Sequence, residues 1–139
     1  YASVEYAFIL VYILTILYIR KFTKRYNLNM IKGIGTDIVS MDRIKDSNIA
    51  DRLLNNDEKA ILDSLNGEAI NEFVSGRWAA KEAIIKASNK EFGISQISVL
   101  NEESGKPYVL IDGEPRNDIM VSISHEKDYT IAFSIITKV

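Results

Sequence analysis

One stretch constrains the fold of this chain more than any other, because the run from Phe73 to Ala87 has no proline and has strong helix formers at most positions. We predict one long helix, beginning near Glu68 and ending near Asn89, where poor helix formers follow. At 3.6 residues per turn, one side of this helix collects mostly small residues, so another element can approach it closely. We expect a sheet to pack there. This small-residue seam consists of Phe73, Gly76, Ala80, Ala83 and Ala87.

A different side of the predicted helix carries polar groups and an aromatic ring. Glu82 and Lys86 lie one turn apart, with Trp78 one turn before them. Two interpretations remain open for the charged pair. It is either an exposed ion pair that contributes about 0.2–0.5 kcal/mol, or part of a site that carries chemistry. Ser75 and Ala79 share this side.

The remaining segments predict an α+β domain with the long central helix packed on an antiparallel sheet. Before that helix we expect a short strand at 31–34, followed by a turn that carries Asp37 at the strand end. Short helices are expected at 42–45 and 49–54, and Asn56 or Asp57 should cap a helix at 58–65. After the central helix the pattern alternates with a period of two. It predicts strands at 94–100, 108–111, 119–124 and 129–136.

Composition narrows the class of protein. The chain has 139 residues, enough for one globular domain, and contains no cysteine, which excludes disulfides and zinc-thiolate sites and is compatible with a reducing cytosol. The net charge of −2 divides into +3 for residues 1–29 and −5 for the rest. An acidic domain argues against general nucleic-acid binding, which needs a basic surface.

The N-terminal segment, 1–29, is set apart from the domain predicted at 30–139. From Tyr6 to Ile19 every residue except Thr15 is apolar or aromatic, and four basic residues follow within 20–25. A membrane-spanning helix needs about 20 apolar residues, so 14 is short. Two interpretations stay open: contact with a membrane through residues 6–25, which would place the domain in the cytoplasm by the positive-inside rule, or a non-native extension of a domain that begins at Met30.

Three separated motifs give the chain a family resemblance. They are Gly-Ile-Gly-Thr-Asp-Ile-Val at 33–39, Arg-Trp-Ala-Ala-Lys-Glu-Ala-Ile-Ile-Lys-Ala at 77–87 and Ser-Ile-Ser-His at 122–125. In order and spacing they resemble the holo-[acyl-carrier-protein] synthase family of phosphopantetheinyl transferases. The turn at 105–108 fits as well, and the resemblance covers 30–139.

The resemblance implies an activity and a set of site residues. A serine hydroxyl of apo-acyl carrier protein attacks the β-phosphate of coenzyme A, which releases adenosine 3',5'-bisphosphate and leaves a phosphopantetheine arm. Asp37 and Glu82 match the family residues that hold Mg²⁺ on the coenzyme A pyrophosphate, and Lys86 suits the neutralisation of phosphate charge. The general base stays open between water relays through Glu82 and Asp37. Coenzyme A contacts are expected from Arg77, Lys81, Lys86 and His125.

The resemblance also implies partners. It implies a homotrimer with active sites at subunit interfaces, and an acidic carrier-protein helix that docks on Arg43, Lys45 and Arg52. One departure matters: the family commonly has a Gly-rich turn after the lysine of the central helix, whereas residues 87–93 read Ala-Ser-Asn-Lys-Glu-Phe-Gly. We expect this to weaken the approach of the backbone to a phosphate. The alternative function is a membrane-tethered module that binds acyl carrier protein with little catalysis.

Overall fold

The computed structural model describes residues 11–21, 30–45 and 48–138. The chain divides into two compact units, Tyr1–Met30 and Ile31–Val139. In the first unit residues 11–21 form a helix, while the rest of the predicted apolar and basic segment lies outside the described residues. Among the described helices, none has both the length and the apolar character needed to cross a membrane.

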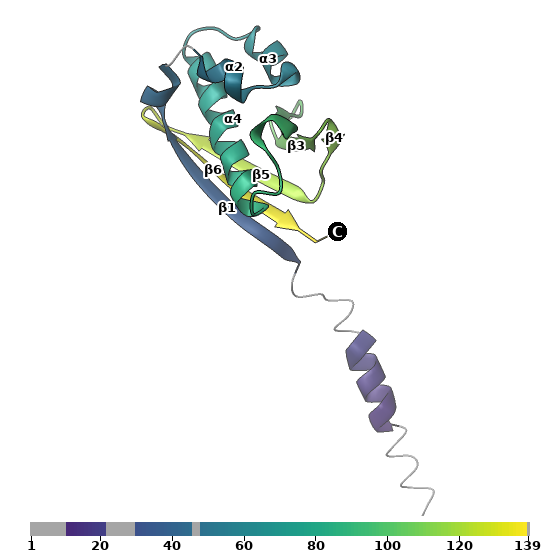
Figure 1. The fold of residues 1–139 in the computed structure, drawn as a ribbon. Coiled ribbons are helices and arrows are strands. Elements are labelled where there is room, and N and C mark those ends of the chain that lie inside the picture. The colour runs from purple at the N-terminus through teal and green to yellow at the C-terminus, as the bar shows by residue number, and fades with distance from the viewer. Residues whose placement is uncertain (1–10, 22–29, 46–47, 139) are drawn as a thin grey trace, which may run out of the picture. The chain divides into compact units, whose positions relative to one another are not determined.

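The second unit is an α+β domain, as predicted, and Figure 1 shows its long helix lying along one face of a sheet. Two three-stranded antiparallel sheets are present, in the orders β1-β6-β5 and β2-β3-β4. Along the chain, the elements up to the end of the long helix are β1 (Ile31–Ser40), η1 (Met41–Lys45), α2 (Ile49–Leu53), α3 (Asn56–Leu62) and α4 (Glu68–Ala87). Those that follow are η2 (Ile94–Gln96), β2 (Ile97–Asn101), β3 (Pro107–Ile111), β4 (Glu114–Pro115), β5 (Ile119–His125) and β6 (Tyr129–Thr137).

The first strand is longer than predicted, and this corrects the expected position of Asp37. β1 continues to Ser40, and Asp37 pairs with Ala132 in the middle of the β1-β6 ladder rather than lying in a turn. Gly33 and Gly35 indicated a turn, but in the structure they serve close packing. Glycine at these positions therefore marks the contact between a strand and a helix.

The small-residue seam of α4 lies against β1, as predicted. A Cβ atom on Gly33 would overlap the carbonyl oxygen of Ala87, and one on Gly35 would overlap that of Ala83. Both alanines are buried, at 7% and 0% exposure. Because only glycine lacks a Cβ, the backbones of β1 and α4 come closer than any other residue would allow.

Two local predictions need correction. The cap of α3 is Asn55, one residue before the expected position, because its side chain accepts the Glu58 N–H while Glu58 accepts the Asn55 N–H, a reciprocal capping box. The strand expected at 94–100 begins at Ile97, since Ile94–Gln96 form a 3₁₀ turn. The other strands appear within one or two residues of their expected positions.

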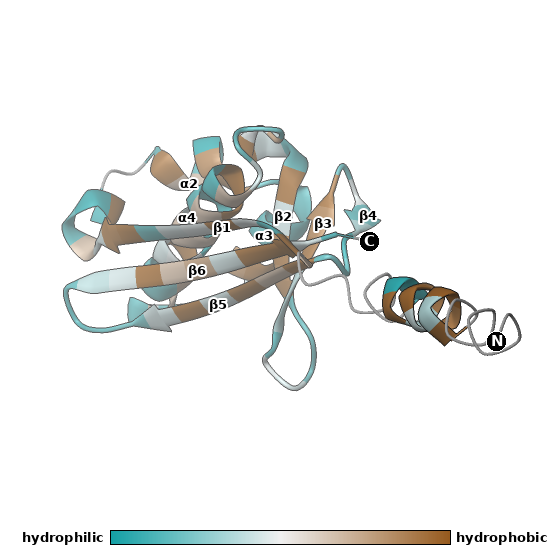
Figure 2. Cartoon of the chain, turned by 90° about the horizontal axis from the view of Figure 1, so that it is seen from below, coloured by the Kyte–Doolittle hydropathy of each residue, from teal (hydrophilic) through white to brown (hydrophobic). Residues whose placement is uncertain are grey.

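The face of the β1-β6-β5 sheet that points away from α4 is apolar and exposed. Side chains alternate along each strand, so those opposite the helix form one row across the sheet. Figure 2 shows hydrophobic stretches along these strands. The exposed outer-face residues are Ile34, Ile38, Met120, Tyr129, Ile131 and Phe133, each 44–59% exposed. A contiguous apolar surface of this kind usually marks an interface.

The seam makes a testable prediction about stability. Gly35→Ala should destabilise the domain by about 3 kcal/mol or more, because the added methyl overlaps backbone atoms that cannot move aside. Gly76→Ala is the matched control on the helix side: its Cβ would lie 3.5 Å from Ile123 Cγ2, an ordinary contact, and alanine should favour the helix by up to about 1 kcal/mol. Thermal unfolding of both variants measures this, and equal melting temperatures would contradict the seam as the closest packing constraint.

Candidate active site

The centre of the candidate site is an ion pair between β1 and α4. Asp37 alternates with Gly35 and Val39 on the face of β1 that packs against α4. Lys86 Nζ donates to Asp37 Oδ1 at 2.7 Å and to the carbonyl oxygen of Thr36 at 3.0 Å. Lys86 is therefore directed to β1 and does not form the simple helix-surface pair with Glu82.

Glu82 lies one turn before Lys86 and lines a groove of about 630 Å³. Within the described residues its carboxylate makes no side-chain hydrogen bond or ion pair. Arg43 Cζ lies 4.2 Å above the Trp78 ring on the same groove, a cation–π contact that holds the guanidinium at the rim. The other lining residues are Ile49, Arg52, Leu53 and Ile94.

The two carboxylates, Asp37 and Glu82, fit a magnesium ion by the chemistry of their donor atoms. Both are hard oxygen ligands, and Mg²⁺ commonly takes one or two protein carboxylates with water and substrate phosphate completing its octahedron. No group of three or more His, Cys, Asp or Glu side chains suited to a metal occurs in the part of the chain that the structure describes. Such a site would therefore depend on substrate oxygens.

Lys81 is buried within the subunit, which contradicts its expected contact with coenzyme A. Its side chain is 0% exposed, and its ammonium donates to Glu58 Oε2 at 2.6 Å and to the carbonyl oxygen of Leu53 at 2.7 Å. Burial lowers the pKa of Lys81, while the neighbouring Glu58 opposes that shift. In this structure Lys81 is a structural cation.

Arg77 is also a structural cation, contrary to expectation. It is only 7% exposed, and its guanidinium donates to the carbonyl oxygen of Val99 at 2.9 Å and to Asn101 Oδ1. The same group lies 4.0 Å above the ring of Phe73. Burial lowers the pKa of Arg77. Because the guanidinium is turned into the interior, Arg77 presents no charge to a ligand.

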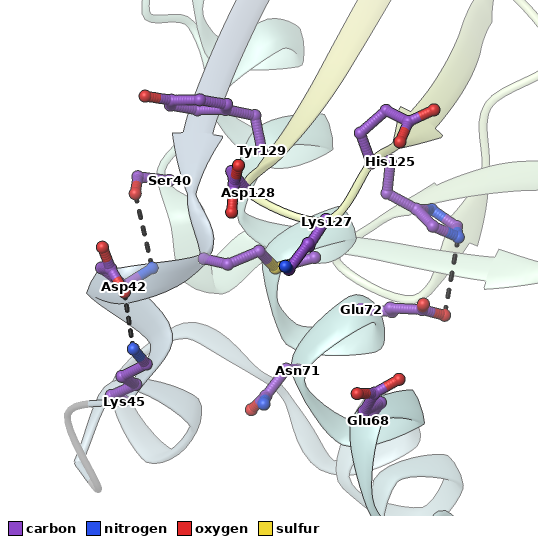
Figure 3. A pocket seen from close by; sticks show the side chains of 12 residues that line it. Ser40, Asp42, Lys45, Glu68, Asn71, Glu72, His125, Lys127, Asp128 and Tyr129 are labelled. Atoms are coloured by element: carbon purple, nitrogen blue, oxygen red, sulfur yellow. Dashed lines mark hydrogen bonds and ion pairs between the residues drawn. The ribbon is translucent and has the colours of Figure 1, made fainter.

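His125 lies in a second cavity, of about 710 Å³, which Figure 3 shows from close by. Its Nε2 lies 3.5 Å from Glu72 Oε2, and both side chains are 47% exposed, so the pair becomes ionic only when the imidazole is protonated. Lys45 lines this cavity too and bonds Asp42 at 2.6 Å. That hydrogen bond lowers the pKa of Asp42 and raises the pKa of Lys45.

The predicted site residues thus fall into three places within one subunit. Asp37 and Lys86 form the ion pair between β1 and α4, and Glu82, one turn before Lys86, lines a groove together with Arg43 and Arg52. His125 and Lys45 line the other cavity. Arg77 and Lys81 are buried.

Sequence reasoning missed Glu58, which is completely buried and accepts hydrogen bonds from Lys81, Asn55 and Val99. The Asn-x-x-Glu spacing at 55–58 is a capping-box signal that could have indicated its place in the chain. Nothing in the sequence indicates that its carboxylate also pairs with Lys81.

Two residues of the turn after Lys86 have the left-handed backbone that glycine favours, although neither of them is glycine. Asn89 and Lys90 have φ values of 54° and 64°, in the left-handed region. Asparagine tolerates this conformation, whereas lysine is strained in it. In place of a Gly-rich turn, this chain therefore has two non-glycine residues with a left-handed backbone.

Comparisons with known proteins agree on one family. The family model described as "4'-phosphopantetheinyl transferase superfamily" matches residues 33–134. A "Holo-[acyl-carrier-protein] synthase" of Geobacillus sp. is 42% identical over 118 residues, which cover 78% of this chain and 98% of that protein. The Petrotoga mobilis protein of the same name is 37% identical over 118 residues, covering 77% of this chain and 97% of that protein.

A solved structure agrees with these relatives. The crystal structure of a holo-(acyl-carrier-protein) synthase from Bacillus anthracis in complex with CoA (3',5'-ADP) superposes with a TM-score of 0.71 at 34% identity. The alignment covers 79% of this chain and 99% of that one. The chain therefore belongs to the 4'-phosphopantetheinyl transferase superfamily and, within it, to the holo-[acyl-carrier-protein] synthase family.

The strained turn gives a prediction. Lys90→Gly should raise the free energy of unfolding by about 1 kcal/mol, because glycine adopts a φ of 64° without the clash of a Cβ atom. Lys90→Ala removes the same charge but keeps the Cβ, so it should give no such gain. Denaturant titrations measure the free energy of unfolding of both variants. An equal gain in both would mean that the lost charge, and not relief of backbone strain, stabilises the domain.

Proposed function

We propose that this chain transfers the 4'-phosphopantetheine moiety of coenzyme A to a serine of apo-acyl carrier protein and releases adenosine 3',5'-bisphosphate. The observation that carries the proposal is the meeting of Asp37 with Lys86, one turn from Glu82, in a member of this family. Those three residues are proposed as the catalytic set. The alternative, a binding module with little catalysis, has no support from the comparisons, since the relatives that match over almost their whole length are named as synthases.

The side chains suit phosphoryl transfer, which depends on positioning and on stabilising charge. The Lys86 ammonium, half exposed, provides positive charge beside the phosphates of coenzyme A. Asp37 and Glu82 are proposed to hold Mg²⁺, which when bound supplies charge neutralisation at the pyrophosphate oxygens. The serine oxygen forms the new bond to the β-phosphorus as the bond to the departing bisphosphate breaks.

The proton of the serine hydroxyl needs an acceptor, and Glu82 is the better of the two candidates. Asp37 already accepts a hydrogen bond from Lys86 through Oδ1, whereas Glu82 makes no such bond to the described residues. We therefore assign the base to Glu82, acting through a water molecule. Glu82→Gln should then remain inactive at every pH, because an amide cannot take up the proton.

A homotrimer is proposed as the active assembly. His125 and Glu82 line different cavities of one subunit, and in an assembly the two residues would come to one coenzyme A from neighbouring subunits. The exposed outer face of β1-β6-β5 supplies the apolar surface for assembly. In this arrangement His125 of a second copy completes the phosphate contacts.

Docking of acyl carrier protein is proposed at the rim of the Glu82 groove. Arg43 and Arg52 line this groove, and the stack of Arg43 on Trp78 fixes a positive charge beside the carboxylate. Lys45 lines the other cavity, so its contribution to docking of the carrier protein is less direct. Because the domain carries a net charge of −5, attraction of an acidic partner has to come from such a local basic surface.

One experiment tests both chemistry and docking. Apo-acyl carrier protein, coenzyme A and Mg²⁺ are incubated with the chain, and the gain in intact mass of the carrier protein is followed. Asp37→Ala should lower kcat at least about 100-fold because charge stabilisation at the phosphate is lost, and Glu82→Gln should do so because the base is lost. Arg43→Glu should raise the KM for the carrier protein with little change in the KM for coenzyme A.

Three results would contradict these assignments. Wild-type turnover in the Asp37→Ala variant, or in excess chelator, removes the metal assignment. A wild-type chain that adds no mass to the carrier protein contradicts the transfer itself. If Arg43→Glu raises the KM for coenzyme A as much as the KM for the carrier protein, the docking surface lies elsewhere.

The proposed trimer makes a separate prediction. Phe133→Lys places a charge on the exposed outer face and should reduce the mass measured by light scattering from trimer to monomer. Tyr108→Lys is the control, because Tyr108 is an exposed aromatic residue of β3 in the other sheet. A monomeric wild-type chain with full activity would contradict the trimer.

Membrane contact is proposed for the N-terminal segment, with the catalytic domain in the cytoplasm. Residues 11–21 form a helix with exposed apolar side chains, and basic residues follow in the sequence. Apolar side chains exposed on a helix, with basic residues close by in the sequence, suit contact with an anionic bilayer surface. The full chain should co-sediment with vesicles containing phosphatidylglycerol, and Leu14→Glu/Leu17→Glu should release it. Sedimentation unaffected by that double change would contradict the contact.

A further inference from the structure

Beneath the candidate site lies a buried ion pair that the proposed chemistry does not use. Lys81 and Glu58 are both 0% exposed, with Nζ and Oε2 2.6 Å apart. The remaining bonds of Glu58 go to backbone: Oε1 accepts the Val99 N–H at 2.9 Å, and Oε2 accepts the Asn55 N–H at 3.1 Å. Both charges are therefore compensated inside the protein, which is the condition for burying them.

This pair joins four elements at one point. Lys81 comes from α4, Glu58 from α3 and Val99 from β2, and the second bond of the Lys81 ammonium goes to the carbonyl oxygen of Leu53, the last residue of α2. The final carbonyls of a helix have no partner within the helix. Lys81 thus satisfies the end of α2 from the interior of the domain.

α2 needs such support because it has only five residues, 49–53, and so short a helix is marginal on its own. The ion pair between α2 and α3, Asp51–Lys59 at 3.3 Å, lies at the surface, where such a pair contributes little to stability. The C-terminal end of α2 is fixed to α4 through the Lys81 ammonium.

The position of α2 decides the shape of the groove. Ile49, Arg52 and Leu53 of α2 line one side, and Trp78 and Glu82 of α4 line the other. Lys81 precedes Glu82 directly in α4, so the same helical turn presents one side chain to the groove and the other to the interior. Leu53 belongs to both environments, since its side chain lines the groove and its carbonyl oxygen bonds Lys81.

We propose that the Lys81–Glu58 pair is a positioning device that holds α2 against α4 and so sets the carrier-protein side of the groove. This rests on the proposed function and adds to it. Neither residue touches a substrate, and their effect passes through the placement of Arg52 and Leu53. Loss of the pair should weaken productive binding of acyl carrier protein more than it affects coenzyme A or the chemical step.

The test uses the full chain with the double variant Lys81→Met/Glu58→Gln. Lys81→Met alone leaves the Glu58 charge buried without a partner and is expected to unfold, whereas the double variant removes both charges and keeps an acceptor for the Val99 N–H. Lys32→Met is the matched control, since Lys32 makes an exposed pair with Glu91 at 3.2 Å. Arg52→Ala serves as the comparator on the docking side.

The double variant should raise the KM for the carrier protein at least tenfold, while kcat and the KM for coenzyme A change less than threefold. Hydrogen exchange should become faster at residues 50–54 and stay slow at 73–85 of α4. Lys32→Met should match wild type, and Arg52→Ala should raise the KM for the carrier protein alone. An unchanged KM for the carrier protein in a folded double variant overturns the inference, and so does a parallel loss in kcat and both KM values.

Failure of the proposed function is distinguishable from failure of this inference. If the wild-type chain transfers nothing, calorimetry with apo-acyl carrier protein still compares the wild type with the double variant. A dissociation constant at least tenfold higher for the double variant supports the positioning role. Equal dissociation constants overturn it.

Discussion

The close contact between β1 and α4 is the constraint on which the rest of the domain depends. Gly33 and Gly35 bring the strand so near the helix that a Cβ atom at either position would overlap the helix backbone. The same contact brings Asp37 to Lys86, because the next residue on that face of β1 is the aspartate. Packing and chemistry therefore share one element of the fold, and a change that separates the two backbones would also separate the proposed catalytic groups.

Three basic residues of α4 show how much depends on surroundings rather than on residue type. Arg77 and Lys81 are buried and bond to protein groups, whereas Lys86, about one turn beyond Lys81, is half exposed and faces Asp37. All three lie in one motif, and the motif suggests phosphate contacts for each of them. Arg77 and Lys81 bond to other parts of the domain because α3 and β2 cover one side of the helix. Lys86 lies outside this covered side, so its ammonium can reach a substrate.

The residues of the proposed site are divided between two cavities of the subunit. The groove beside Glu82 and the cavity beside His125 are lined by different residues, and the outer face of the β1-β6-β5 sheet remains apolar and exposed. Assembly of copies through that face would cover it and complete the site at the same time. Burial of this surface and completion of the catalytic groups would then both follow from the association of copies through one sheet.

The sequence by itself determined the α+β class, the long helix from Glu68, the small-residue seam and the family, because helix propensity, hydrophobic period and motif spacing are local properties of the chain. Only the tertiary structure decided that β1 runs on through Asp37, that Lys81 pairs with Glu58, and that His125 and Glu82 lie in separate cavities. Each of these depends on partners distant in the sequence or on how closely two backbones approach. Residue patterns fix which side of an element is apolar, but which charge becomes buried and paired is settled when the elements pack together.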